Sequence, residues 1–140
     1  MASKIFIDIN ILIDFLDPKR LKHIDAAELL DKAESGICMP YATESVLNTV
    51  AYLVRKDFNA KAVSAVFEHL LTFLEIIPVY KNAYQYALRN VANDVEDAVL
   101  YQAALENNID YFITNDLKDF RKIATVSLPV KTAAELLKLL

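Results

Sequence analysis

Short apolar segments alternate along this chain with longer stretches of helical periodicity. The apolar segments are rich in β-branched and aromatic residues and are expected to form strands at 4–9, 37–39, 74–77 and 111–114. The stretches between them repeat apolar residues every three or four positions, which is typical of helices. Strands separated by helices pair in parallel through right-handed crossovers. The alternation therefore predicts an α/β fold, a three-layer α/β/α sandwich with a mainly parallel central sheet.

Helix patterns and turn residues divide the chain further. Helices are predicted at 11–15, 23–33, 43–56, 60–72, 82–90, 95–106 and 132–140, with a short turn or helix at 117–120. Pro18 and Gly36 end the first two helices, Pro40 ends the second strand, and Asn59 caps the helix that follows it. A last edge strand is predicted at Val126. With no linker, repeat or low-complexity tract, residues 1–140 are expected to form a single domain.

Composition excludes several kinds of site. The 140 residues include one glycine, one cysteine and two histidines. Phosphate-binding loops and dinucleotide turns need several glycines at fixed spacing, and Cys38 alone permits neither an internal disulfide nor a cysteine zinc cluster. A metal ion would therefore be held by carboxylates. The net charge of −4 argues against a protein that coats nucleic acid with a basic surface, but not against an enzyme that holds nucleic acid through metal ions.

The sequence also indicates in which compartment of the cell the protein is expected. No apolar stretch approaches the roughly 20 residues of a membrane span. The N-terminal segment reaches Asp8 before an apolar run of the length of a secretory signal has formed. We therefore expect a cytoplasmic protein with no membrane partner.

Four acidic residues lie near the ends of predicted strands or at the start of a predicted helix. Asp8 lies near the carboxyl end of the first strand, Glu44 follows the second, and Asp116 follows the strand at 111–114. Asp97 lies in the first turn of the helix that Asp94 caps. Open parallel sheets bind ligands beyond the carboxyl ends of their strands, so these acids are expected at one edge of the sheet. Oxygen ligands suit Mg²⁺ or Mn²⁺, which activate water for attack on phosphoryl groups, and the pattern predicts phosphodiester hydrolysis.

Polar residues near these acids are candidates for supporting roles. At about 100° per residue, Glu44, Asn48 and Arg55 fall within roughly 40° of one another and form a polar stripe on their helix. The stripe would present an acid, an amide and a cation to the site. Thr114 and Asn115 are expected either to donate hydrogen bonds to a water or a phosphate or to make the hydrogen bonds of an ordinary turn.

Three segments together carry a wider pattern. They read FIDINILID at 6–14, DVEDAVLYQAA at 94–104 and YFITNDLKDF at 111–120. In order and spacing they resemble the PIN domain family, of the kind found as the toxin in VapBC-type toxin–antitoxin pairs, over nearly the whole chain. The resemblance implies a ribonuclease that depends on Mg²⁺ or Mn²⁺ and holds the ion with three or four acids.

The resemblance assigns the site residue by residue. It implies three metal ligands, Asp8, Asp97 and Asp116, which are also catalytic, with Asn10 as the companion of Asp8. Two positions compete for the family's second acid. Asn48 stands where relatives often carry a glutamate, and Glu44 lies one turn upstream. We choose Glu44 as the fourth catalytic acid because it is the only carboxylate on that face of the helix.

Three other acids have alternative interpretations. Asp94 is interpreted chiefly as a helix N-cap that supports the site. Asp119 is a rival to Asp116, and we prefer Asp116 because it is closer to the end of its strand. Asp14 is expected either on the surface of its helix or in support of the ligands, rather than as a ligand.

Three functional hypotheses follow. The first is a metal-dependent endoribonuclease with an RNA substrate, for which the resemblance implies a cognate antitoxin and a homodimer. The second is a catalytically weak or inactive PIN-like domain that binds protein or RNA, and Asn48 motivates it. The third is a phosphatase or receiver-like domain with an aspartate at a strand end. This last is disfavoured because Asn10 stands where a phosphoryl-accepting phosphatase would carry its second aspartate.

Overall fold

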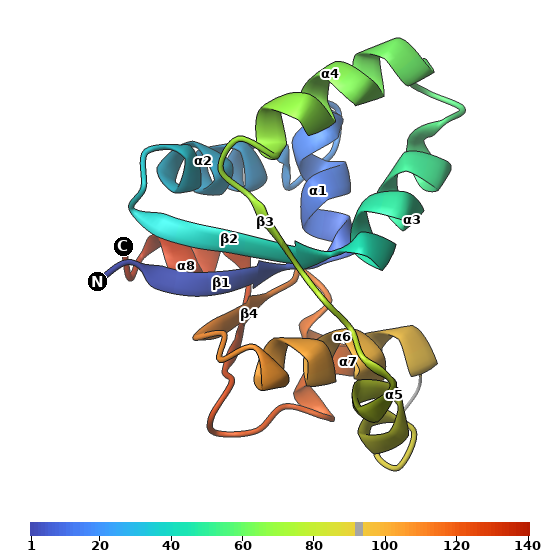
Figure 1. Ribbon diagram of the computed structural model, residues 1–140. Coiled ribbons are helices and arrows are strands. Elements are labelled where there is room, and N and C mark those ends of the chain that lie inside the picture. Colours follow the sequence, from blue (N-terminus) through green and yellow to red (C-terminus); the bar gives the residue numbers. More distant parts are fainter. Residues whose placement is uncertain (92–93) are drawn as a thin grey trace.

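The structure is a computed structural model that describes residues 1–91 and 94–140, and its centre is a parallel sheet (Figure 1). Every strand pairing is parallel, and the strand order is β3-β2-β1-β4-β5. The strands are β1 (Ser3–Ile7), β2 (Cys38–Thr43), β3 (Glu75–Ile77), β4 (Tyr111–Ile113) and β5 (Val130–Lys131). The predicted α/β class and parallel sheet are confirmed.

Helices cover the two faces of this sheet. The described helices are α1 (Ile9–Leu16), α2 (His23–Glu34), α3 (Glu44–Val54), α4 (Ala60–Leu70), α5 (Lys81–Ala87), α6 (Val95–Glu106), α7 (Leu117–Arg121) and α8 (Ala133–Leu137). In Figure 1, α1 to α4 lie above the strands, and α5, α6 and α7 lie below them. Helix α8 packs against α2 and β5. The arrangement is the predicted three-layer sandwich.

The middle of the sheet is fully buried. Strands covered by helices on both faces are apolar throughout, and Ile5, Phe6 and Ile7 of β1 are inaccessible to solvent. The ring of Phe6 stacks on the ring of Phe112 in β4, with the two centroids 4.9 Å apart. The ring of Phe112 in turn packs against Phe120 of α7, with a centroid distance of 4.5 Å. This aromatic core fixes the ends of β1 and β4 relative to α7.

Backbone pairing sets the polar edge of the sheet. Ile7 of β1 pairs with Ile113 of β4, and the amide of Asp8 donates to the carbonyl of Ile113 at 3.0 Å. The next residue, Thr114, donates its amide to the carbonyl of Lys131 at 3.0 Å. The chain therefore delivers Asp8 and the segment at 114–116 to the same end of neighbouring strands.

The predicted end of the second strand at Pro40 is wrong. Strand β2 continues through Pro40 to Thr43. Proline lacks an amide hydrogen and is tolerated in a strand where one side is unpaired. Pairing of β2 with β3 begins only at Tyr41, so at Pro40 the strand has a neighbour only in β1.

The predicted edge strand at Val126 is also wrong. Val126 is 99% exposed, between Thr125 and Leu128, which form an antiparallel bridge across a turn. The last strand instead begins at Val130, which pairs with Phe112. An isolated β-branched residue does not distinguish a strand from a turn, and the buried partner on β4 decides the register.

Two further predictions concern helix ends and membrane spans. The side chain of Asn59 accepts a hydrogen bond from the amide of Ala62 at 2.8 Å, which confirms it as an N-cap. Helix α8 is shorter than predicted and ends at Leu137. Among the helices of the described residues, none has the length and apolar character needed to cross a membrane.

Candidate metal centre

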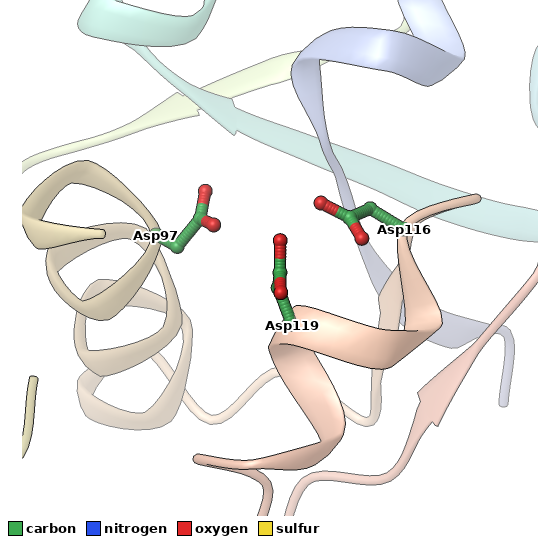
Figure 2. A group of neighbouring side chains, drawn as sticks. All are labelled: Asp97, Asp116 and Asp119. Atoms are coloured by element: carbon green, nitrogen blue, oxygen red, sulfur yellow. The ribbon is translucent and has the colours of Figure 1, made fainter. Parts of the chain in front are cut away.

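Three carboxylates converge beside the carboxyl ends of β1 and β4. Asp97 comes from the first turn of α6, Asp116 is the residue before α7, and Asp119 lies within α7. One oxygen from each lies within 4.8 Å of the other two, and Figure 2 shows the three side chains pointing toward one another. Asp119 is a rival of Asp116 in the sequence, whereas the structure brings both into one group. One turn of α7 separates them, so both can face α6.

Asp8 directly follows β1 and lies close enough to this group to interact with the charges of Asp97 and Asp116. Its side chain is 4% exposed, and the hydroxyl of Thr114 donates to its carboxylate at 2.8 Å. Burial raises the pKa of Asp8 to about 6, although the hydrogen bonds from Thr114 and from the backbone of Ile9 oppose that rise. The charges of Asp116 and Glu96 raise it further. Asp8 is therefore electrostatically part of the acidic group.

The pKa values of Asp97 and Asp116 are also raised. Burial, followed by the charges of Asp94, Asp8 and other acids, raises the pKa of Asp97 to about 7. Burial and the neighbouring Asp119 are the main causes that raise the pKa of Asp116. Like charges held close together disfavour ionisation, and a divalent cation between them would reverse that effect.

The start of α6 contributes two further acids. The side chain of Asp94 accepts a hydrogen bond from the amide of Asp97 at 3.0 Å, which confirms the predicted N-cap. This bond fixes the turn that carries Asp97. Glu96 was not singled out in the sequence, yet its charge raises the pKa of Asp8, and burial and Asp94 raise the pKa of Glu96 itself. Its position next to Asp97 in the DVEDAV motif was the available signal.

A hydrogen-bond network ties the two strand ends together. The hydroxyl of Thr114 is fully buried and, besides donating to Asp8, accepts from the amide of Asp116 at 3.0 Å and from Nδ2 of Asn10 at 3.4 Å. Oδ1 of Asn10 in turn accepts from the amide of Asn115 at 3.2 Å. The three polar residues predicted near the site thus hold Asp8 and Asp116 in a fixed relation.

Asp14 extends this network away from the acids. Its side chain is buried at 4% exposure, so the surface position considered from the sequence is wrong. Its two carboxylate oxygens accept from Nδ2 of Asn115 at 2.8 Å and from Nε of Arg20 at 2.6 Å. Asp14 therefore supports the loop that carries Asp116.

The polar stripe on α3, formed by Glu44, Asn48 and Arg55, lies outside the carboxylate group. Glu44 is exposed at the start of α3 and, with Asn48, lines a hollow against the end of β3 at Ile77 and Pro78. Arg55, at the other end of α3, donates to the carbonyl of Tyr52 at 2.6 Å and lies over its ring at 3.7 Å. The structure therefore does not bring this stripe into the carboxylate group of Asp97, Asp116 and Asp119.

The donor set fits a hard divalent cation. Carboxylate oxygens are the ligands that Mg²⁺ and Mn²⁺ prefer, and Asp97, Asp116 and Asp119 offer three that lie within 4.8 Å of one another. Asp8 adds a buried carboxylate beside them whose orientation Thr114 fixes. The polar partners of Asp8 and Asp97 are typical of groups that orient ligands in metal sites.

Fold and carboxylates together match a known class of proteins. The sequence model of the PIN domain family matches residues 4–118. The chain therefore belongs to the PIN domain family, as its motifs predicted.

Three proteins similar to this chain carry VapC or VapBC names. Ribonuclease VapC1 of Aquifex aeolicus is 25% identical over 120 residues, which cover 82% of this chain and 83% of the relative. Among solved structures, VapC20 of Mycobacterium tuberculosis, a toxin that cleaves the sarcin-ricin loop, superposes with a TM-score of 0.70 at 17% identity, covering 89% of this chain and 98% of VapC20. VapBC2 of Rickettsia felis, bound to promoter DNA, superposes with a TM-score of 0.66 at 18% identity. The superposition covers 91% of this chain and 97% of the VapBC2 chain.

Proposed function

We propose that this protein is a metal-dependent endoribonuclease and the toxin of a toxin–antitoxin pair. The observation that carries the proposal is the group of Asp97, Asp116 and Asp119, whose carboxylate oxygens lie within 4.8 Å of one another beside the buried Asp8. Membership of the PIN domain family supports it, and so does the likeness to Ribonuclease VapC1. The substrate we propose is RNA.

In this proposal Asp8, Asp97 and Asp116 hold Mg²⁺ or Mn²⁺, and Asp119 adds a further carboxylate to the group. The bound ion would lower the pKa of a water nucleophile and stabilise charge on the phosphoryl oxygens. Glu44 remains our proposed fourth catalytic acid, from the neighbouring strand end. The role of Thr114 is to keep Asp8 oriented through its hydrogen bond of 2.8 Å.

The carboxylates also bear on proton transfer. Hydrolysis adds the hydroxide part of water to phosphorus, breaks the bond to the 3′ oxygen and returns a proton to that oxygen. The products carry a 5′-phosphate and a 3′-hydroxyl. A carboxylate of this acidic group that does not bind the cation would accept the proton that the attacking water gives up.

The proposed partners follow from the same family. The VapBC2 relative is a toxin–antitoxin assembly on promoter DNA, and we propose an antitoxin and a homodimer for this chain as well. The net charge of −4 and the acidic edge of the sheet favour an antitoxin that inserts a basic segment there.

The direct test is cleavage of an RNA oligonucleotide. The wild-type protein is expected to cleave with Mg²⁺ or Mn²⁺ and to stop in EDTA, and Asp8→Asn is expected to lose at least a hundredfold in rate. Asp31→Asn is the matched control, because Asp31 is an exposed aspartate on α2. Cleavage that persists in EDTA, or full activity in Asp8→Asn, would refute the mechanism.

A further inference from the structure

An open hollow lies directly beside the acidic group. Its volume is about 620 Å³, and it is lined by Asn10, Asp14, Arg20, Leu21, Lys22, Asn115 and Asp116. Asp116 belongs both to this hollow and to the carboxylate group, so the two sites share a wall. A polymer that places one phosphate at the acids therefore has an adjoining space for its next residue.

The arginine in this hollow is held by a buried acid. Nε of Arg20 donates to Asp14 at 2.6 Å, and Asp14 is 4% exposed. This bond uses one of the five N–H donors of the guanidinium and fixes the plane of the group. The remaining donors suit the paired oxygens of a phosphate. Because its acid partner is buried, Arg20 is oriented before any ligand arrives.

The same acid connects the hollow to the metal centre. Asp14 also accepts from Nδ2 of Asn115 at 2.8 Å, and the ring Nδ1 of His23 lies 2.9 Å from its backbone carbonyl. Asn115 in turn precedes Asp116, the shared wall. The position of Arg20 relative to the acids is therefore built into the fold rather than left to a surface side chain.

Two exposed residues complete the hollow. Lys22 adds a second cation, and Leu21 between the two cations is 94% exposed. A cation pair that flanks an apolar side chain suits a nucleotide, whose phosphate needs charge and whose sugar and base offer apolar surface. In a chain of net charge −4, this hollow places two cations, Arg20 and Lys22, next to the acids of the candidate metal centre.

We propose that this hollow binds the nucleotide next to the scissile phosphate of a single-stranded RNA, with Arg20 and Lys22 on its phosphate and Leu21 against its sugar or base. The inference rests on the proposed ribonuclease function and assigns one side of the RNA path. A protein segment rich in acidic residues is the competing occupant, and it would leave RNA kinetics independent of these cations.

The test is steady-state cleavage of one RNA oligonucleotide at several salt concentrations with Mn²⁺ present. Lys22→Gln is expected to raise KM three- to tenfold with little change in kcat, and to flatten the dependence of log(kcat/KM) on log[salt] by about 0.7. Arg20→Lys keeps the charge but loses the planar guanidinium that can bind two phosphate oxygens at once. It is expected to raise KM without flattening the dependence of log(kcat/KM) on log[salt]. Lys19→Gln is the matched control, because Lys19 is exposed on the same loop and outside the hollow.

Two results would overturn the subsite while leaving the ribonuclease proposal intact. One is unchanged KM and salt slope in both Lys22→Gln and Arg20→Lys. The other is an equal effect in Lys19→Gln, which would indicate general attraction instead of a site. Failure of the wild-type protein to cleave RNA would instead refute the proposed function itself. Thermal unfolding of each variant, expected to match the wild type within a few degrees, excludes loss of folding as the cause.

Discussion

The hydroxyl of Thr114 donates a hydrogen bond of 2.8 Å to the carboxylate of Asp8, across 106 positions of sequence. The same oxygen accepts from the amide of Asp116 at 3.0 Å. One buried hydroxyl therefore fixes two candidate metal ligands that come from neighbouring strands. This relation is the structural basis for the first prediction.

Replacing Thr114 with valine keeps the shape of the side chain and removes the hydroxyl. Asp8 then loses a donor in a buried position, and the free energy of unfolding is expected to fall by about 1–3 kcal/mol. RNA cleavage is expected to fall at least tenfold, because Asp8 is no longer oriented. Thr114→Ser is the control and should retain most activity in the same assays. Wild-type stability and rate in Thr114→Val would show that the hydroxyl does not organise the site.

The raised pKa values predict how stability depends on pH without metal. The pKa of Asp97 rises from 3.8 to about 7 on folding, and that of Asp8 from 3.8 to about 6. Between the unfolded and folded values the folded state binds more protons, so the free energy of unfolding decreases as pH rises. The metal-free protein is therefore expected to be less stable at pH 8 than at pH 5, as denaturant unfolding in EDTA would show.

Asp97→Asn isolates one part of this effect. At pH 8 the variant is expected to be more stable than the wild type by on the order of 1 kcal/mol, a figure reduced for the partial exposure of Asp97. Near pH 4 the two proteins should agree more closely, because Asp97 is protonated in the folded wild type. A variant with the same pH slope as the wild type would contradict the interpretation. Asp31→Asn serves again as the surface control.

Asp119 is expected to contribute to metal binding. Its carboxylate lies within 4.8 Å of those of Asp97 and Asp116, so Asp119→Asn should weaken Mn²⁺ binding by about tenfold, or about 1.4 kcal/mol. Calorimetry measures this affinity, and Asp57→Asn, an exposed aspartate after α3, is the control. An unchanged affinity would remove Asp119 from the ligand set. If the wild type binds no Mn²⁺ at millimolar concentration, a catalytically inactive binding domain is favoured.

Substitution of Glu44 tests whether this residue is the fourth catalytic acid, as proposed from the sequence. If it completes the catalytic set, Glu44→Gln lowers kcat for RNA at least tenfold and leaves thermal unfolding unchanged, because the side chain is exposed. Glu28→Gln is the matched control, because Glu28 is an exposed glutamate on α2 outside the proposed site. Equal activity in Glu44→Gln and the wild type would confine catalysis to the acids around Asp97.

Local patterns in the sequence were sufficient to predict the parallel sheet, most of its strands and several of the polar residues that the structure brings together at its edge. Each strand at 4–9, 74–77 and 111–114 corresponds to an observed strand, because buried parallel strands are continuously apolar. The rule that ligands bind beyond the carboxyl ends of parallel strands predicts that Asp8 and Asp116 lie at the same edge of the sheet. The N-cap role of Asp94 was equally local, since it depends on one side chain and the next turn of backbone.

What the sequence did not predict depends on contacts between distant residues. Asp119 joins the acids because α7 turns it toward α6, and Asp14 is buried because Arg20 and Asn115 surround its carboxylate. No periodicity encodes either relation. The edge strand was misplaced at Val126 for the same reason, since its true position depends on pairing with β4.

The most direct test of the central claim is to locate a manganese ion by anomalous scattering from crystals of the protein grown or soaked with Mn²⁺. The proposal predicts a peak bounded by carboxylate oxygens of Asp97, Asp116 and Asp119, with Asp8 beside it, at the place where Figure 2 shows the first three acids converging. Such a peak would be absent in crystals of Asp116→Asn. A manganese ion bound elsewhere, or none at millimolar concentration, would contradict the assignment of this acidic group as the metal centre.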